Sequence, residues 1–277
     1  MIFGDFQTTR IGSYISVIPK GDYQVMPYVN NKGVNIYYQI EGNGPPLVMH
    51  HWSFATLKSW YDYGYVSHLK DKYQLILFDS RGHGASDKLY KPSDYTLKKR
   101  VMDIATILDN LHIDKAHFLG YSMGGWVGFG ITQYAPERFL SLTIGGQHPY
   151  AKSLESNRKF ASYGIEHGPD TFISKWEKEI GILPPNQKKQ IHSYDFKSLL
   201  AVAQDRLSQE TVLPSIKLPC LLYAGKKDKD YHLIQKCVNI IPDVIFVPLP
   251  DLDHGGVIRH SELVVPIIKK FLSERIA

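Results

Sequence analysis

Short runs of consecutive apolar residues, each bounded by Gly, Pro, Asp or Ser, recur along this chain. Such runs are typical of strands that are covered on both faces. They lie at residues 47–50, 75–78, 116–119, 140–144, 221–223 and 244–247. Between them, apolar residues recur at helical spacing, most clearly at 97–111 and 258–276. Strand alternating with helix predicts an α/β fold, a mostly parallel sheet flanked by helices.

Two departures from this rhythm define the expected domain organisation. Segments 23–29 and 34–40 alternate in polarity and are joined by Asn and Gly residues, which predicts an antiparallel hairpin at one edge of the sheet. Residues 147–213 contain four helix-like stretches and no good strand, and they are flanked by Gly and Pro signals. The stretches are 156–167, 170–180, 186–192 and 195–205. We therefore expect a core of residues 22–146 and 214–277, a helical insertion at 147–213, and an extension at 1–21 without clear periodicity.

Composition narrows the class of protein further. The 277 residues are 43% hydrophobic and 21% charged, as in ordinary globular proteins, and the formal net charge is only +5. Lysine pairs are scattered among acids, which indicates solvated surface rather than a nucleic-acid footprint. The chain shows neither a signal peptide nor an apolar stretch of roughly 20 residues, so we expect a cytoplasmic protein with no membrane partner. Two cysteines in a chain of this length do not indicate a disulfide scaffold.

The most informative motif is the G-x-S-x-G pentapeptide at residues 120–124. An apolar strand ends at Leu119, and a pattern rich in small residues begins at Gly124. A serine at such a strand-to-helix turn projects its hydroxyl clear of the sheet, with the helix N-terminus facing the developing negative charge. Ser122 is therefore the candidate nucleophile. The alternative is a glycine-rich turn with an incidental serine.

A serine nucleophile needs a histidine base, which usually follows it in the chain. Three histidines come after the strand at 221–223. His260 falls inside the last predicted helix and His232 opens another helix. His254 lies in a loop directly after the strand at 244–247, followed by two glycines that let the backbone turn. We predict His254 as the base.

The acid that orients the histidine is expected at the C-terminal end of the strand at 221–223. Asp228 and Asp230 both follow that strand. Asp230 is placed to cap the helix that starts at the next residue, so Asp228 is the candidate. Asp251 and Asp253 are too close in sequence to the histidine to align behind it.

With these residues in place, the chain from 34 to 275 resembles the α/β-hydrolase family. It contains the G-x-S-x-G motif, and residues 79–86 resemble the family's Asp-x-Arg-Gly-x-Gly-x-Ser turn. The resemblance places the triad at Ser122, Asp228 and His254, in agreement with the selection above. It further implies an eight-stranded sheet, with residues 147–213 as a cap over the site.

The chain departs from the family pattern where the backbone helps to form the oxyanion hole. The family has His-Gly-x after the third strand, whereas this chain has His50, His51 and Trp52. The alignment implies that the backbone N–H groups of Trp52 and Met123 stabilise the oxyanion. Because His51 replaces a glycine, we expect it, with Tyr121, to contact substrate. For His51, packing beneath the cap is an equally open alternative.

The predicted reaction is acyl transfer, with hydrolysis of a small to medium, mainly apolar ester or lactone. Aromatic residues of the insertion could line an apolar pocket, although packing is the more ordinary role. They are Phe160, Tyr163, Phe172, Trp176, Tyr194 and Phe196. Relatives within the family cleave C–C bonds or amides or support peracid chemistry, and a ligand sensor that keeps the triad is a further alternative. A dehalogenase or an epoxide hydrolase is disfavoured, because those enzymes need an Asp at the position of Ser122. The predicted chemistry needs neither a cofactor nor a metal, and the partner is a small-molecule substrate.

Overall fold

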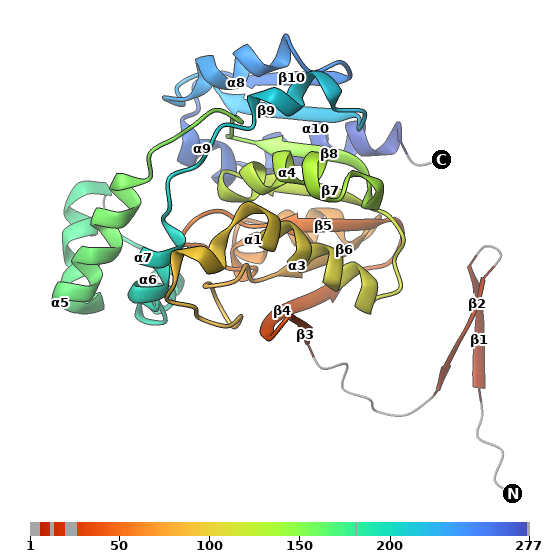
Figure 1. Ribbon diagram of the computed structural model, residues 1–277, viewed down its shortest axis with the longest axis horizontal. Helices are drawn as coiled ribbons and strands as arrows, with labels where there is room; N and C mark the ends of the chain where they lie inside the picture. The colour runs from red at the N-terminus through yellow and green to blue at the C-terminus, as the bar shows by residue number, and fades with distance from the viewer. Residues whose placement is uncertain (1–5, 12–13, 20–26, 181, 276–277) are drawn as a thin grey trace, which may run out of the picture.

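The computed structural model describes residues 6–11, 14–19, 27–180 and 182–275. Its centre is an eight-stranded sheet with the order β10-β9-β8-β7-β5-β6-β4-β3 (Figure 1). The strands from β5 to β10 pair in parallel, whereas β4 is antiparallel to β6 and β3 is antiparallel to β4. The strands are β3 (Tyr28–Asn31), β4 (Val34–Glu41), β5 (Pro46–His50), β6 (Gln74–Phe78), β7 (Ala116–Tyr121), β8 (Phe139–Gly145), β9 (Cys220–Gly225) and β10 (Val244–Leu249). The predicted mostly parallel sheet is confirmed.

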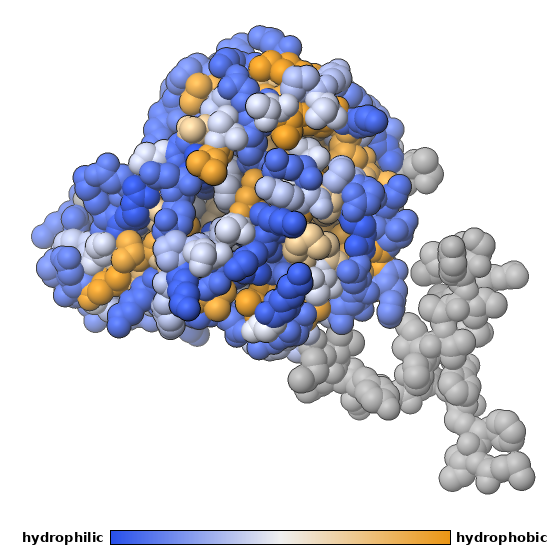
Figure 2. Space-filling view, in the orientation of Figure 1, coloured by the Kyte–Doolittle hydropathy of each residue, from blue (hydrophilic) through white to orange (hydrophobic). Residues whose placement is uncertain are grey.

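Helices cover both faces of this sheet because alternate strand residues point to opposite sides. In β5, Val48 joins the apolar cluster on one face, while Leu47 and Met49 join the cluster on the other. The first face is covered by α3 (Leu97–Asn110), α4 (Met123–Tyr134) and α8 (Tyr231–Val238). The second is covered by α1 (Lys58–Asp62), α2 (Tyr65–Leu69), α9 (His254–Arg259) and α10 (Ser261–Ser273). With the apolar side chains buried in these clusters, the face in Figure 2 shows only small hydrophobic groups among hydrophilic residues.

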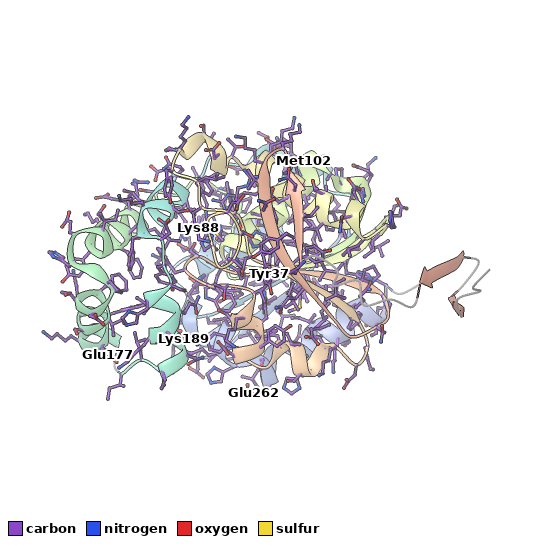
Figure 3. All side chains as sticks on the ribbon, turned by 90° about the horizontal axis from the view of Figure 1, so that it is seen from below. Tyr37, Lys88, Met102, Glu177, Lys189 and Glu262 are labelled. Carbon is purple, nitrogen blue, oxygen red and sulfur yellow. The ribbon has the colours of Figure 1, made fainter. Side chains whose placement is uncertain are left out.

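Three further helices follow β8 in the chain and precede β9. They are α5 (Glu155–Ile180), α6 (Pro185–His192) and α7 (Phe196–Val202). In Figure 1 they lie together on one side of the sheet, and they have an apolar cluster of their own. Figure 3 labels Glu177 on α5 and Lys189 on the neighbouring α6, and the adjacent Lys188 pairs with Glu177 at 2.7 Å. We call this group the inserted helices.

Several predicted boundaries differ in the structure. The stretches 156–167 and 170–180 keep their predicted separation, because Gly168 (φ 73°, ψ 171°) and Pro169 interrupt α5 with a kink between them. The stretch predicted at 195–205 ends as a helix at Val202. The predicted helix 258–276 is wrong as a single element: α9 and α10 are separated at His260, whose ring nitrogen bonds the Gly256 carbonyl at 2.8 Å.

The N-terminal predictions are only partly described. Val34–Glu41 forms one strand of the predicted hairpin, and the turn has positive φ at Lys32 and Gly33. Its partner β3 begins at Tyr28, and residues 23–26 of the predicted segment lie outside the described residues. Within the extension, β1 (Phe6–Ile11) and β2 (Tyr14–Pro19) pair as a separate antiparallel sheet, which the pattern did not predict. In the part of the chain that is described, no helix has the length and apolar character needed to span a bilayer.

Candidate active site

Ser122 occupies the turn between β7 and α4 with φ 50° and ψ −106°, a backbone conformation that a residue with a Cβ rarely adopts. The flanking glycines are required by contact. A Cβ on Gly124 would lie 2.1 Å from the carbonyl oxygen of His50, and a Cβ on Gly120 would lie 2.5 Å from the Gly124 backbone. The turn is thus pressed against the end of β5, and Ser122 is held at the carboxyl edge of the sheet. Its side chain stays partly accessible.

Asp228 and His254 form a hydrogen-bonded pair at the same edge. The Nδ1 of His254 lies 2.7 Å from Oδ2 of Asp228, whose side chain is 1% exposed, while the histidine side chain is 40% exposed. Oδ1 of Asp228 accepts the backbone N–H of Asp230 at 3.0 Å. Burial opposes ionisation of Asp228, but the hydrogen bond and charge of His254 outweigh it, so the pKa of Asp228 is lowered. The carboxylate therefore stays ionised and fixes the proton on Nδ1 of His254.

His254 is the first residue of α9 rather than a loop residue, and this corrects the predicted reason for its position. Neither Gly255 nor Gly256 has positive φ; the turn is made by Asp251, with φ 60°. Asp253 then caps the helix by accepting the N–H of Gly256 at 2.6 Å. The two glycines therefore do not supply the turn that brings the imidazole to the sheet edge.

Tyr121 connects His254 to the turn that carries Ser122. Its hydroxyl donates to the carbonyl oxygen of His254 at 2.5 Å, and the two rings lie 5.3 Å apart. Tyr121 immediately precedes Ser122, so this contact places the imidazole beside the nucleophile turn. Among the described residues, Ser122 Oγ makes no hydrogen bond, and neither does Nε2 of His254.

The other acid and histidine candidates lie elsewhere. Asp230 stands at the N-cap position of α8, but its side chain does not cap the helix, which corrects that prediction. Its carboxylate pairs instead with the ammonium group of Lys152. His232 is exposed on α8, and His260 bonds back to the carbonyl of Gly256. No described trio of His, Cys, Asp or Glu side chains is grouped in a way that would hold a metal ion.

The two predicted oxyanion donors, Met123 and Trp52, follow Ser122 and His51 in the turn after β7 and the loop after β5. Met123 is the first residue of α4, so its N–H has no acceptor within the helix. Trp52 lies in the loop after β5, and its N–H has no hydrogen-bond partner among the described residues. Because the His50 carbonyl lies directly against Gly124, the loop after β5 is close to the turn that carries Ser122.

His51 is anchored in this loop and does not line the cavity described below. Its side chain is fully buried; Nδ1 donates to the carbonyl of Trp52 at 2.8 Å, and Nε2 accepts the backbone N–H of Ser80 at 3.0 Å. Burial lowers the pKa of His51, so the ring is neutral with its proton on Nδ1. Tyr121 is also buried, and its hydroxyl is used by His254. The structure thus places both predicted substrate contacts in supporting positions.

The Asp-x-Arg-Gly-x-Gly-x-Ser turn, residues 79–86, packs against the loop after β5. Asp79 accepts the N–H groups of Leu57 and Ala85 at 2.8 and 2.7 Å, and a Cβ on Gly84 would collide with its carboxylate. In the same turn, Arg81 makes two hydrogen bonds to Asp103 on α3, at 2.6 and 2.5 Å. This motif is structural, and it holds the loop after β6 against the loop after β5.

A cavity with a volume of about 420 Å³ lies between the core and the inserted helices. The cavity reaches the Ser122 turn through Met123, which follows Ser122, and through Ser53, which follows Trp52. Ser122 itself is not in the lining. The six aromatic residues of the insertion are absent from this lining; they pack in or against the apolar cluster of the inserted helices.

Sequence reasoning missed two polar residues of this lining, Arg100 and Arg206, which are 2% and 5% exposed. One signal was available for Arg100. It lies four residues before Ile104 and seven before Ile107, on the stripe of α3 that was predicted to be apolar. A cation on such a stripe indicates a buried polar site. Arg206 had no comparable signal, because it follows α7 in an irregular segment.

An open α/β sheet with a strained serine after a central strand, and a histidine held by a buried carboxylate at the same edge, is typical of the hydrolase class of this fold. Residues 45–178 match the model of the alpha/beta hydrolase fold family. The chain is 36% identical over 229 residues to 3-oxoadipate enol-lactonase 1 of Acinetobacter baylyi, covering 72% of this chain and 78% of that protein. It is 33% identical over 221 residues to a putative carbamate hydrolase of Azorhizobium caulinodans, covering 73% and 81%.

Solved structures agree on the fold. The enol-lactonase of Burkholderia xenovorans superposes with a TM-score of 0.78 at 22% sequence identity, over 89% of this chain and all of that one. At this identity the likeness concerns the fold alone. The relatives above show that the chain belongs to the α/β-hydrolase family.

Proposed function

We propose that this protein is a serine hydrolase that cleaves a small to medium ester or lactone through an acyl-enzyme on Ser122. One observation carries the proposal: the strained Ser122 turn stands beside a buried Asp228 that holds His254 at 2.7 Å. Relatives named enol-lactonase and carbamate hydrolase support the hydrolytic class. In this proposal residues 147–213 form the cap that covers the substrate.

In the first half-reaction, Nε2 of His254 removes the proton from Ser122 Oγ as the oxygen attacks the substrate carbonyl carbon. The carbonyl oxygen becomes an oxyanion that accepts the N–H groups of Trp52 and Met123. The intermediate collapses, the bond to the leaving oxygen breaks, and His254 returns its proton to that oxygen. For a lactone, the released alcohol remains part of the acyl group.

In the second half-reaction, His254 removes a proton from water, and the hydroxide oxygen attacks the acyl carbon. Collapse of the second oxyanion breaks the bond to Ser122 Oγ, which recovers a proton from His254, and the carboxylic acid leaves. Asp228 stabilises the protonated imidazole in both halves. Tyr121 and His51 act as positioning residues, the first on His254 and the second on the Trp52 backbone. These steps need no cofactor.

Hydrolysis of p-nitrophenyl esters from acetate to octanoate tests the proposal, with wild type and Ser122→Ala measured side by side. We expect multiple turnovers by wild type and a loss of about 10³-fold or more in the variant, because the nucleophile is removed. Ser67→Ala is the matched control, since Ser67 is exposed on α2. Equal activity of Ser122→Ala and wild type would overturn the role of Ser122. Absence of turnover by wild type across esters and lactones would overturn the hydrolase proposal and favour a ligand sensor.

A further inference from the structure

Two buried arginines border the cavity without an acidic partner. In the described part of the chain, neither Arg100 nor Arg206 has a carboxylate within ion-pair distance. The buried Arg81 is the contrast, because Asp103 binds its guanidinium at two points. Burying a cation is costly unless an anion accompanies it. The cavity arginines therefore lack a compensation that the structural arginine has.

The protein meets the two guanidinium groups only with neutral acceptors. Arg100 donates through Nε to the carbonyl of Tyr95 at 3.0 Å and through Nη1 to Ser80 Oγ at 3.4 Å. Arg206 donates through Nη1 to Oε1 of Gln147 at 2.8 Å. Among the described residues, Nη2 of Arg100 and both Nε and Nη2 of Arg206 have no hydrogen-bond partner. Each arginine thus keeps N–H donors that face no acceptor of this chain.

One indole holds both cations at the same wall of the cavity. The guanidinium carbons of Arg100 and Arg206 lie 6.0 and 5.2 Å from the ring centroid of Trp126, which also lines the cavity. Burial, and then the charge of Arg100, lowers the pKa of Arg206 to about 9, so it remains a cation at neutral pH. Stacking on an aromatic face fixes the planar guanidinium and leaves its edge to bind an anion.

The site is continuous with the reaction centre. Nη1 of Arg100 lies 3.6 Å from the sulfur of Met123, whose backbone N–H is a proposed oxyanion donor. The acidic group in the lining, Asp205, stands at a more exposed position and is neutralised by Arg158 at 2.6 Å. The two cations therefore dominate the charge of the buried wall, and a ligand can span from them to the elbow.

We infer that Arg100 and Arg206 bind a carboxylate carried by the substrate, so that the preferred ester or lactone is an otherwise apolar molecule with one acidic end. This inference rests on the proposed hydrolase function and names the substrate class of that site. The guanidinium groups match a carboxylate in geometry and charge. The acid binds at the Trp126 wall while the scissile carbonyl lies at Ser122.

A matched pair of esters tests the inference: the mono-p-nitrophenyl ester of adipic acid and p-nitrophenyl hexanoate, which has the same chain length and no charge. After subtraction of the uncatalysed rates, we expect wild-type kcat/KM to be about 10- to 100-fold higher for the acidic ester. In Arg206→Gln, we expect this ratio to fall to near one. Arg138→Gln removes the same charge from a surface pair with Asp109 and should keep the wild-type ratio.

If circular dichroism shows that Arg206→Gln does not fold, Arg206→Lys is measured in its place. The lysine keeps the charge but loses the planar fork, so an intermediate ratio is expected. Turnover of hexanoate without any preference for the acidic ester in wild type would overturn the inference and leave the hydrolase proposal intact. A full wild-type preference in a folded Arg206→Gln or Arg206→Lys variant would also overturn it. If neither ester nor any lactone is turned over, the hydrolase proposal itself fails.

Discussion

At the scale of single residues, the site depends on side chains whose ionisation and tautomer are fixed by hydrogen bonds. Asp228 is nearly inaccessible and holds Nδ1 of His254, which leaves Nε2 as the free basic nitrogen. His51 also carries its proton on Nδ1, which donates to the Trp52 carbonyl, but its Nε2 is occupied because it accepts the backbone N–H of Ser80. One histidine is therefore free to exchange a proton while the other is not.

Asp228→Asn tests the orienting role of the carboxylate. The amide keeps the size of the side chain but cannot stabilise the imidazolium, so we expect kcat to fall by about 10³- to 10⁴-fold. Asp230→Asn is the matched control, because the Asp230 side chain binds Lys152 rather than His254. Steady-state ester hydrolysis measures both. Comparable losses in the two variants would contradict the assignment.

The stability of the fold should depend on the same carboxylate at low pH. The pKa of Asp228 is lower in the folded chain than its ordinary value of 3.8. At pH values between the folded and the unfolded pKa, the unfolded chain therefore binds more protons than the folded chain. The stabilisation is therefore fully present above about pH 4 and is lost as the pH falls through the folded pKa. We expect the difference in unfolding free energy between wild type and Asp228→Asn to shrink from pH 7 to pH 3 in urea titrations. A constant difference would contradict this, and Asp251→Asn, at an exposed site, should show little effect at either pH.

At the scale of elements, the loop after β5 is coupled to the inserted helices. Phe54 has a positive φ of 62°, and its carbonyl accepts bonds from Tyr194 and from Nε2 of Gln190, the latter at 3.0 Å. Its ring lies 4.2 Å from that of Phe160 on α5. Because this loop also carries Trp52, the inserted helices help to fix the backbone proposed to bind the oxyanion.

Tyr194→Phe removes one of these bonds while keeping the ring. We expect kcat to decrease by about 3- to 30-fold with little change in fold, because small displacements of a transition-state donor are costly. Tyr90→Phe is the matched control; the Tyr90 hydroxyl bonds Asp195 at an exposed site. Circular dichroism and ester kinetics distinguish the outcomes. If both variants kept wild-type kcat, the proposed coupling would be wrong.

At the scale of the whole molecule, a buried ion pair joins three separate parts of the chain. Asp103 on α3 binds Arg81 in the turn after β6 and also accepts a hydrogen bond from Asn31 of β3 at 2.7 Å. The group ties the antiparallel edge of the sheet to its parallel centre. The loop after β6 depends on this group, and the loop carries Ser80, which anchors His51.

Asp103→Ala should therefore destabilise the protein by about 3–5 kcal/mol, because it leaves a buried guanidinium without its anion. Asp109→Ala on the same helix breaks a pair in which the carboxylate side chain is 65% exposed, and it should cost less than about 1 kcal/mol. Chemical denaturation followed by circular dichroism measures both. Similar costs for the two variants would show that Asp103 is not the anchor described here.

Local pattern was sufficient for much of this molecule. The six apolar runs correspond to β5 to β10, and the α3 pattern corresponds to a helix, because burial on both faces of a sheet and on one face of a helix leaves periodic signatures. The strand–serine–helix turn was also predictable, since its glycines are demanded by backbone contacts within a few residues and with β5. Two predictions were wrong. The Asp230 carboxylate binds Lys152 instead of capping α8, and the C-terminal helix is interrupted at His260, whose ring binds the Gly256 carbonyl.

Only the tertiary structure decided which distant side chains meet. Strand order, with β5 between β7 and β6, brings the loops after these strands together, and no local pattern encodes that order. The same packing turned His51 away from the cavity and brought Arg100 and Arg206 against one tryptophan from segments more than a hundred residues apart. Sequence determines elements through short-range periodicity, whereas charge complementarity in a cavity arises only when separate segments are folded onto one another.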